Sequence, residues 1–282
     1  MEKFEFINKN TQKVFDAILT AKPTLNYSIL KTALRKKDIK VNGTKIKENV
    51  EIEIGDKVEI FLREKKDKKI DIVYEDENVL LAFKPAGIET TQKDKTFVNS
   101  KSLEELTKAV ACHRLDKNTE GIVILAKNQM AENSVIDAFK TGNIKKEYLA
   151  IVFGKVNPNG ENLVNYLKKE QNFVKICKNS DENAKIAKLS YNVINSKNNL
   201  HLIRINLETG RTHQIRVQLA GKGIFVLGDE KYGDKDINKK YHKSKQQLCA
   251  YKITFKNLTA PLKYLEGKSF EVEPNFKLDD FI

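Results

Sequence analysis

Two polar clusters of this sequence hold residue types that could do chemistry beside apolar strands. The first, residues 111–121 (ACHRLDKNTEG), contains Asp116, whose carboxylate could act as a nucleophile or stabilise a developing cation. The second, residues 207–216 (LETGRTHQIR), contains Arg211 and His213. Functional side chains often lie at such junctions, where a rigid scaffold holds them. The residues alone leave plainer roles open: a turn or an ion pair for the aspartate, a salt bridge for the arginine and a partly buried position for the histidine.

No motif of a cofactor, metal or nucleotide site accompanies these clusters. The chain lacks GxxxxGK[ST] for ATP, GxGxxG for dinucleotides, HExxH for zinc and the GxSxG of serine hydrolases. Its four histidines show no metal-ligand spacing. Its three cysteines form no CxxC pair, so neither a disulfide framework nor a zinc ribbon is indicated. We therefore expect chemistry that uses no cofactor and no metal.

The balance of charge favours a polyanionic partner. The 282 residues include 51 Lys and Arg against 38 Asp and Glu, a formal net charge of +13. Because contacts to phosphates supply most non-specific nucleic-acid affinity, this composition indicates RNA or DNA binding. The alternative is a lysine-rich proteome, in which unrelated proteins are basic too. We see no secretory signal and no apolar run of membrane-spanning length, so we expect a cytoplasmic protein without a membrane partner.

The apolar pattern predicts a small domain at residues 1–64, a charged linker at 65–70 and a larger domain at 71–282. The small domain is expected to form two helices followed by short strands, with Asn42 and Gly43 in a turn. Four cations fall beside the apolar stripe of its second helix and are candidate contacts to RNA: Lys31, Arg35, Lys36 and Lys37. An ordinary solvated helix face remains the alternative for these four residues.

The larger domain is expected to be rich in strands with helices interspersed irregularly. Strands are predicted at residues 121–127, 148–153, 187–194 and 200–207, and helices at 130–139 and 212–220. This order suits an α+β fold with a mixed, mainly antiparallel sheet better than a doubly wound parallel sheet.

Five blocks of the sequence, in order, resemble the RluA-type pseudouridine synthases. They are KPAG at residues 84–87, HRLDKNTEG at 113–121, K-x-Y at 146–148, GRTHQIRVQLA at 210–220 and GD-x-x-YG at 228–233. Residues from about 12 to 62 resemble the S-four-type RNA-binding domain, in the order helix, basic helix, VNG, GDKVEI. The resemblance implies the pseudouridine synthase fold and an enzyme that breaks the N1–C1′ bond of uridine in RNA and forms a C5–C1′ bond, without a cofactor.

The resemblance also implies roles for single residues. Asp116 would be the catalytic carboxylate, and Arg211 would pair with it and hold it ionised and oriented. Tyr148 would stack on the flipped uracil. Arg114 would lie at the entrance and hold the RNA with the target base extruded, and Ile215 would form a wall of the pocket.

One departure lies beside these residues. The family often has Thr-Ser-Gly where this chain has Thr119-Glu120-Gly121, so Glu120 could change a local contact to RNA.

The expected substrate is large-subunit ribosomal RNA, with transfer RNA as the alternative, and the expected state is a monomer. Two other classes of function stay open. A ribosome-assembly factor could keep the fold without the activity, although the intact set of Asp116, Tyr148 and Arg211 argues against it. A basic DNA-binding protein would leave the two polar clusters unexplained.

Overall fold

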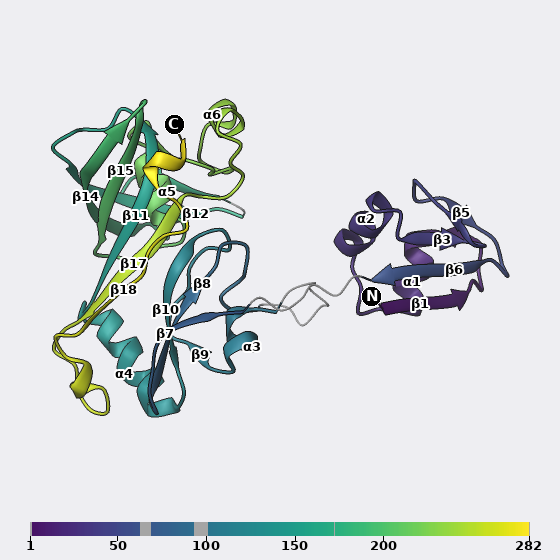
Figure 1. Cartoon of the computed structure of the whole chain (residues 1–282), viewed down its shortest axis with the longest axis horizontal. Coiled ribbons are helices and arrows are strands. Elements are labelled where there is room, and N and C mark those ends of the chain that lie inside the picture. The colour runs from purple at the N-terminus through teal and green to yellow at the C-terminus, as the bar shows by residue number, and fades with distance from the viewer. Residues whose placement is uncertain (1, 63–68, 93–100, 172, 282) are drawn as a thin grey trace. The chain divides into compact units, whose positions relative to one another are not determined.

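A computed structural model describes residues 2–62, 69–92, 101–171 and 173–281. These residues form two compact units, the first with residues 2–62, 92 and 101 and the second with residues 69–91, 102–171 and 173–281 (Figure 1). The expected linker at 65–70 lies largely outside the described residues.

The N-terminal unit combines a small antiparallel sheet with two helices around one core. The sheet runs in the order β1 (Glu2–Ile7), β6 (Lys57–Leu62), β3 (Ile39–Val41), β4 (Thr44–Lys45), and β2 (Gln12–Lys13) pairs separately with β5 (Glu51–Ile52). The helices are α1 (Val14–Ala21) and α2 (Tyr27–Arg35). Their apolar faces meet the sheet at Ile18, Leu30 and Ile60, which are fully buried.

Both helices of the N-terminal unit were expected, but its first strand was not. The side chain of Asn26 accepts a hydrogen bond from the backbone N–H of Ile29 and so caps the start of α2. Strand β1 pairs with β6, more than fifty residues later in the chain, from Glu2 opposite Leu62 to Ile7 opposite Lys57. Its alternation of Phe and charged residues has the strand period of two, which is the local signal for this strand.

The larger unit is built on one long, strongly twisted sheet. Its main order is β13, β12, β14, β15, β11, β17, β10, β8, β7, and every pair in that order is antiparallel except β10 with β17. The three short strands β16, β18 and β9 join β11, β17 and β10 at the side of this order. The bounds are β7 Asp71–Glu75, β8 Val79–Lys84, β9 Val110–Ala111, β10 Glu120–Ala126, β11 Ile144–Gly154, β12 Glu161–Lys169, β13 Val174–Cys177, β14 Lys185–Lys197, β15 Leu200–Leu207, β16 Ile224–Val226, β17 Leu248–Phe255 and β18 Ser269–Glu271.

Helices lie on both faces of this sheet, and each face has its own core. Helix α4 (Gln129–Lys140) packs on one core with Ile124 and Phe255, and α5 (Gln214–Ala220) packs on the other with Tyr191 and Ile205. The remaining helices are α3 (Leu103–Thr107), α6 (Lys235–Lys240) and two 3-10 turns at Lys263–Leu265 and Leu278–Phe281. The expected α+β fold with a mainly antiparallel sheet is confirmed.

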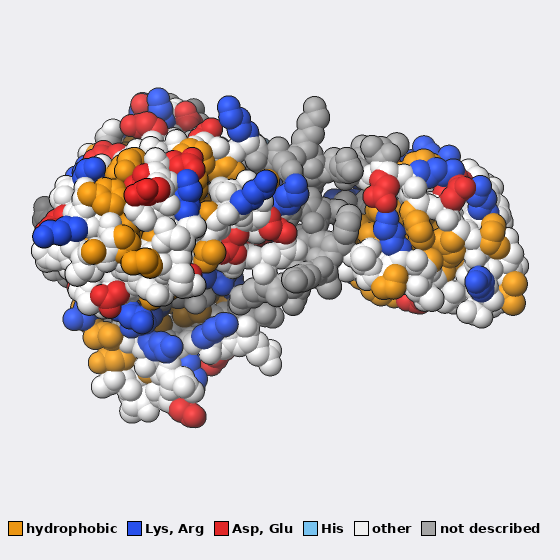
Figure 2. Space-filling view, turned by 90° about the horizontal axis from the view of Figure 1, so that it is seen from below, with side chains coloured by type: hydrophobic (Ala, Val, Ile, Leu, Met, Phe, Trp, Pro, Cys, Tyr) orange, Lys and Arg blue, Asp and Glu red, His pale blue; other side chains and the backbone are white. Residues whose placement is uncertain are grey.

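Among the described residues, no helix combines the length and apolar character that crossing a bilayer requires. On the face of the molecule in Figure 2, Lys and Arg side chains are spread between acidic and apolar ones rather than gathered in one patch. This face therefore offers a polyanion no single basic patch.

Candidate active site

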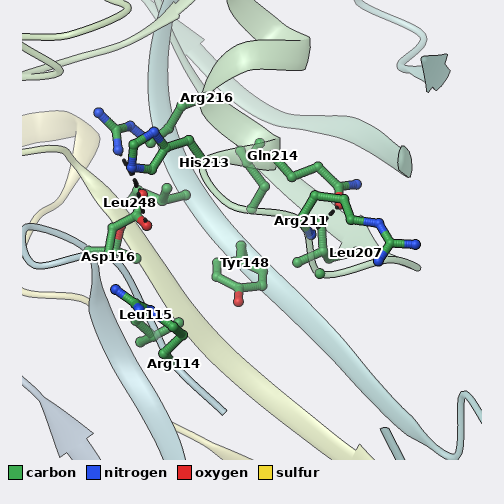
Figure 3. Close-up of a pocket in the computed structure, with 13 residues that line it drawn as sticks. Arg114, Leu115, Asp116, Tyr148, Leu207, Arg211, His213, Gln214, Arg216 and Leu248 are labelled. Atoms are coloured by element: carbon green, nitrogen blue, oxygen red, sulfur yellow. Dashed lines mark hydrogen bonds and ion pairs between the residues drawn. The ribbon is translucent and has the colours of Figure 1, made fainter. Parts of the chain in front are cut away.

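The two polar clusters meet at one pocket of the larger unit (Figure 3). Asp116 comes from the loop before β10, Tyr148 from the middle of β11, and Arg216 from the first turn of α5. Arg114 and Ile215, both expected at the pocket, also line it. Segments a hundred residues apart in the chain are thus brought to one place by the sheet that carries β10 and β11.

The carboxylate of Asp116 is held by a buried arginine. Arg216 donates from Nη1 to Asp116 Oδ2 at 2.7 Å, from Nε to Asp229 Oδ2 at 2.7 Å and from Nη2 to Asp229 Oδ1 at 2.8 Å. The guanidinium therefore makes a bidentate contact with Asp229, and its third nitrogen binds Asp116. Arg216 and Asp229 are 6% and 1% exposed, whereas the Asp116 side chain is 23% exposed and faces the pocket. Charge-assisted bonds of this geometry fix a carboxylate in both position and orientation.

Burial alone would lower the pKa of Arg216 and raise that of Asp229. Their hydrogen bonds and opposite charges outweigh burial, so the pKa of Arg216 is raised and the pKa of Asp229 is lowered. Backbone N–H groups of Lys231 and Tyr232 also donate to Asp229 Oδ1, at 2.9 and 3.2 Å, and help to keep this carboxylate charged. The pair is therefore ionised inside the protein, and Arg216 presents a full positive charge to Asp116.

The expectation that Arg211 would pair with Asp116 is wrong. The Nε of Arg211 donates to the carbonyl oxygen of Ile186 at 3.0 Å, and the side chain is exposed at the rim of the pocket (Figure 3). The physical reason is the start of α5, which begins at Gln214 because His213 takes a left-handed backbone conformation with φ of 54°. Arg211 consequently precedes the helix, and Arg216 is the arginine that the first turn directs inward.

The loop that carries Asp116 is fixed by hydrogen bonds from the KPAG segment. The Nζ of Lys84, which is fully buried, donates to the carbonyl oxygen of Lys117 at 3.1 Å, and the backbone N–H of Gly87 donates to the same oxygen at 2.7 Å. On the other side, Thr90 and Leu115 exchange two hydrogen bonds of 3.2 Å. The backbone oxygen of Asp116 accepts from the Thr119 N–H at 3.0 Å, so main-chain atoms close the turn and the carboxylate serves the ion pair.

Tyr148 lies beside Asp116 with its hydroxyl directed into the pocket (Figure 3). The pairing of β11 with β17 shifts register between Glu147 and Tyr148, and such a bulge re-aims the side chain that follows it. Burial, and then the charge of Asp116, raise the pKa of Tyr148 well above its usual value. Its hydroxyl therefore stays protonated at neutral pH, and it has no hydrogen-bond partner within the described part of the chain.

His213 is a second group that faces the Asp116 carboxylate. Its Nε2 lies 3.8 Å from Asp116 Oδ1, and its Nδ1 lies 2.9 Å from the hydroxyl oxygen of Tyr232. That oxygen already accepts from the Val174 N–H at 2.9 Å, so the tyrosine proton is available for Nδ1. In the tautomer in which Tyr232 donates to Nδ1, the neutral imidazole carries its own proton on Nε2, towards Asp116. Burial lowers the pKa of His213 more than the nearby Asp116 raises it, which keeps the ring neutral.

Reasoning from sequence did not anticipate the roles of Asp229 and Tyr232. The ring centroid of Tyr232 lies 5.0 Å from the guanidinium carbon of Arg216, so Tyr232 supports both Arg216 and His213. Both missed residues belong to the GD-x-x-YG block, and that block was the signal that could have identified them.

Glu120 does not present its carboxylate to an RNA contact, contrary to what its departure from the family pattern suggested. It is 5% exposed, and its two oxygens accept from the backbone N–H and the side-chain amide of Asn275, at 2.7 and 3.1 Å. The extra carboxylate is therefore used to attach the C-terminal segment to β10.

The four candidate RNA-binding cations of the N-terminal unit lie on and just after α2. Lys31 and Arg35 line a surface hollow together with Tyr27, and Lys36 and Lys37 are exposed beyond the end of the helix. No metal site accompanies either unit within the described ranges, where His, Cys, Asp and Glu do not gather in groups of three or more.

Comparisons with known proteins all point to one family of enzymes. The family model described as RNA pseudouridylate synthase matches residues 78–221. The chain is 34% identical over 244 residues to "Ribosomal large subunit pseudouridine synthase C" of Rickettsia felis, covering 76% of this chain and 79% of that protein. It is 31% identical over 309 residues to an "Uncharacterized RNA pseudouridine synthase" of Mycoplasma capricolum, covering 98% and 99% of the two chains.

The fold has solved counterparts as well. The structure of human RNA pseudouridylate synthase domain containing 4 superposes with a TM-score of 0.57 at 22% identity, covering 72% of this chain and 88% of that one. The human domain containing 1 protein superposes with a TM-score of 0.57 at 21% identity, covering 75% and 92%. The resemblance carried by the five sequence blocks is confirmed, and the chain belongs to the RluA-type family of RNA pseudouridine synthases.

Proposed function

We propose that this enzyme isomerises specific uridines of large-subunit ribosomal RNA to pseudouridine, with Asp116 as its catalytic carboxylate. The observation that carries the proposal is the position of Asp116: its charged oxygen faces a pocket beside Tyr148 and is fixed from behind by Arg216. The names of the Rickettsia relatives, which refer to the ribosomal large subunit, support ribosomal RNA over transfer RNA as the substrate.

The reaction requires that the N1–C1′ bond break, that the uracil turn, and that a C5–C1′ bond form. A carboxylate can contribute by attacking the sugar or the base, or by stabilising positive charge on the sugar. Neither bond is accessible in a base stack, so the target nucleotide has to leave the helix. In the proposed complex the ring of Tyr148 lies against the extruded uracil, Ile215 forms a wall, and Arg114 at the pocket mouth holds the strand.

The N-terminal unit is proposed to be an S-four-like RNA-binding domain. Its exposed cations Lys31, Arg35, Lys36 and Lys37 provide contacts to phosphates, whose energy does not depend on sequence. A separate unit of this kind suits a large folded RNA, on which the target uridine lies apart from the RNA segment that the N-terminal unit binds. We propose that the protein acts as a monomer in the cytoplasm, where ribosomal RNA is found.

The proposal is tested by carbodiimide mapping of pseudouridine in total RNA from cells with and without the gene. One or a few defined stops in large-subunit ribosomal RNA should disappear on deletion. They should return with the wild-type gene and not with Asp116→Ala. Restoration by Asp116→Ala would refute the catalytic assignment. Unchanged stops after deletion would refute the activity on ribosomal RNA and favour a role in ribosome assembly.

A further inference from the structure

A second cavity, of about 580 Å³, adjoins the catalytic pocket. The two share a wall that includes Arg114, Tyr148 and Arg211. The outer part of the second cavity is lined by the C-terminal end of α4 and by the first residues of β11. An RNA strand that places one base against Tyr148 would carry its neighbouring nucleotide across this shared wall.

Positive charge dominates the lining of the second cavity. It holds the cations Arg114, Lys140, Lys146 and Arg211 against one carboxylate, that of Glu208. Within the described part of the chain, none of the four cations lies within 4.0 Å of a carboxylate oxygen. Cations that line a concave surface and have no counter-charge favour an anionic ligand.

Lys146 is the cation placed deepest in this cavity. Its Nζ lies 5.4 Å from the centroid of the Phe139 ring and 3.6 Å from the point that a Cβ on Gly210 would occupy, so it lies beneath the turn that carries Arg211. Burial, and then the charge of Arg211, lower the pKa of Lys146. An anion bound between these two cations would relieve both effects, because it compensates the repulsion and replaces lost hydration.

His113 adds a hydrogen-bond donor to the same cavity. Its Nε2 accepts from the Ile124 N–H at 3.0 Å, and burial lowers its pKa to about 3, so the ring is neutral and its proton is on Nδ1. Within the described residues Nδ1 has no acceptor. Because His113 lines the cavity, its Nδ1–H group can donate to a ligand there.

We propose that this second cavity is the subsite for the nucleotide that flanks the target uridine, with the phosphodiester held between Lys146 and Arg211. The nucleotide itself occupies the space beside Phe139, with the His113 Nδ1–H as a donor to its polar edge. This assignment rests on the proposed function, since it takes the ligand to be the strand whose uridine enters the catalytic pocket. It makes the enzyme read at least two nucleotides of one strand.

The test is the salt dependence of binding to fluorescein-labelled decauridylate, a single-stranded RNA, followed by anisotropy in increasing KCl. Loss of one phosphate contact lowers the slope of log K against log salt by about 0.7 for a single strand. Lys146→Gln should show that loss, and Lys146→Arg should retain the wild-type slope. The matched control is Lys145→Gln, which removes the same charge from the preceding residue of β11; Lys145 pairs with Glu147 at 3.1 Å.

Equal slopes for Lys146→Gln and the wild type would overturn the subsite, as would an equal decrease in Lys145→Gln. If Lys146→Gln does not fold, Arg211→Gln should lower the slope by the same amount, and an unchanged slope there would overturn the proposal. Because the readout is affinity and not turnover, it is separate from the mapping of Asp116→Ala. If Asp116→Ala loses pseudouridine while Lys146→Gln keeps the wild-type salt slope, the subsite alone is refuted.

Discussion

The position of Asp116 depends on a buried arginine that two carboxylates share. Asp229 takes two of the guanidinium nitrogens and Asp116 takes the third, so the orientation of Arg216 is set from the side away from the pocket. Two further side chains complete the surroundings: the ring of Tyr232 lies against Arg216, and His213 approaches Asp116 from the same side. Asp116, the proposed catalytic residue, therefore needs no backbone strain of its own to stay in place.

Asp229→Asn should reduce turnover without a comparable effect on RNA affinity. An amide cannot accept both guanidinium bonds, so Arg216 loses its fixed orientation and Asp116 moves with it. We expect kcat to fall about 10²-fold, the usual cost of a small misplacement in an active site, and KM for RNA to change only a few-fold. Breaking a buried pair also destabilises the fold by about 3–5 kcal/mol. Steady-state kinetics and urea unfolding measure the two effects.

The exposed Asp236, in the same segment of the chain, provides the control for the Asp229 variant. Asp236→Asn removes an equal charge and should leave both kcat and stability near wild type. A kcat of Asp229→Asn equal to that of Asp236→Asn would show that Arg216 does not depend on Asp229.

The neutral state of His113 makes the stability of the larger unit depend on pH. The pKa in the folded protein is about 3, below the usual 6.5, so below pH 6.5 the unfolded chain takes up a proton that the folded chain does not. Stability should therefore decrease as the pH falls from 6.5 towards 3, by about 2 kcal/mol at pH 5.

Hydrogen exchange of peptides from β10, measured at pH 6.5 and pH 5 with correction for intrinsic exchange, isolates this effect of His113. The decrease in stability at pH 5 should be smaller by about 2 kcal/mol in His113→Gln. It should persist in His242→Gln, which removes an exposed histidine. An identical pH dependence in His113→Gln and the wild type would show that His113 is not held neutral in the folded protein.

At the residue scale, the sequence predicted which residues gather but not which of them pair. Asp116, Tyr148 and Ile215 line the pocket as expected, because each lies in a motif that can be recognised from the sequence alone. The partner of Asp116 was assigned to Arg211 rather than Arg216, since the choice depends on where α5 begins. That start is set by the left-handed backbone of His213, a residue that the expected helix at 212–220 treated as helical.

Strand β10 is the element that brings the Asp116 loop to the rest of the site. It is buried along its whole length and forms the parallel pair with β17, where Gly121 lies opposite Ala250. Gly121 has φ of 120°, and a Cβ there would overlap the backbone oxygen and nitrogen of Ala250. The glycine is therefore required by both conformation and space, one residue after the start of the strand at Glu120.

Gly121→Ala should destabilise the larger unit by at least about 3 kcal/mol, because a backbone overlap in a core strand adds to the cost of the positive φ. Gly267→Ala is the control: its φ is 77°, and a Cβ there would meet nothing within 4 Å. It should cost only about 1–2 kcal/mol. Thermal unfolding of both variants measures these losses of stability. Equal losses in Gly121→Ala and Gly267→Ala would show that close packing against β17 is unimportant.

At the element scale, the local sequence pattern predicted which helices and strands form better than it predicted which strands pair. Strand β15 was predicted with its observed bounds, and α4 was predicted within one residue at each end. The order of strands in the large sheet could not be predicted, because pairs such as β10 with β17 join residues more than a hundred positions apart. The period of apolar residues reports which face is buried but not which strand lies alongside.

The whole molecule combines a catalytic unit with a separate basic unit, and the proposed division of labour can be measured. Replacing the four cations of α2 (Lys31, Arg35, Lys36 and Lys37) with Gln should lower the slope of log K against log salt by up to about three for folded ribosomal RNA. Turnover once the RNA is bound should change little, because these residues lie outside the catalytic unit.

A matched set of exposed lysines in the same unit controls for net charge: Lys9, Lys13, Lys45 and Lys47. Their replacement with Gln should affect the slope much less than replacement of the α2 set. Equal slopes for the two quadruple variants would show that affinity follows overall charge and not the α2 surface.

The central claim is that Asp116 performs the isomerisation, and tritium release measures it most directly. Forming the C5–C1′ bond replaces the hydrogen at C5, so RNA labelled with tritium at uracil C5 releases tritium to water as pseudouridine forms. With purified enzyme in excess over labelled large-subunit ribosomal RNA, the wild type should release tritium from a fixed number of sites. Asp116→Asn should release none while binding the RNA within a few-fold of wild type. Release by Asp116→Asn at a rate near that of the wild type would contradict the account.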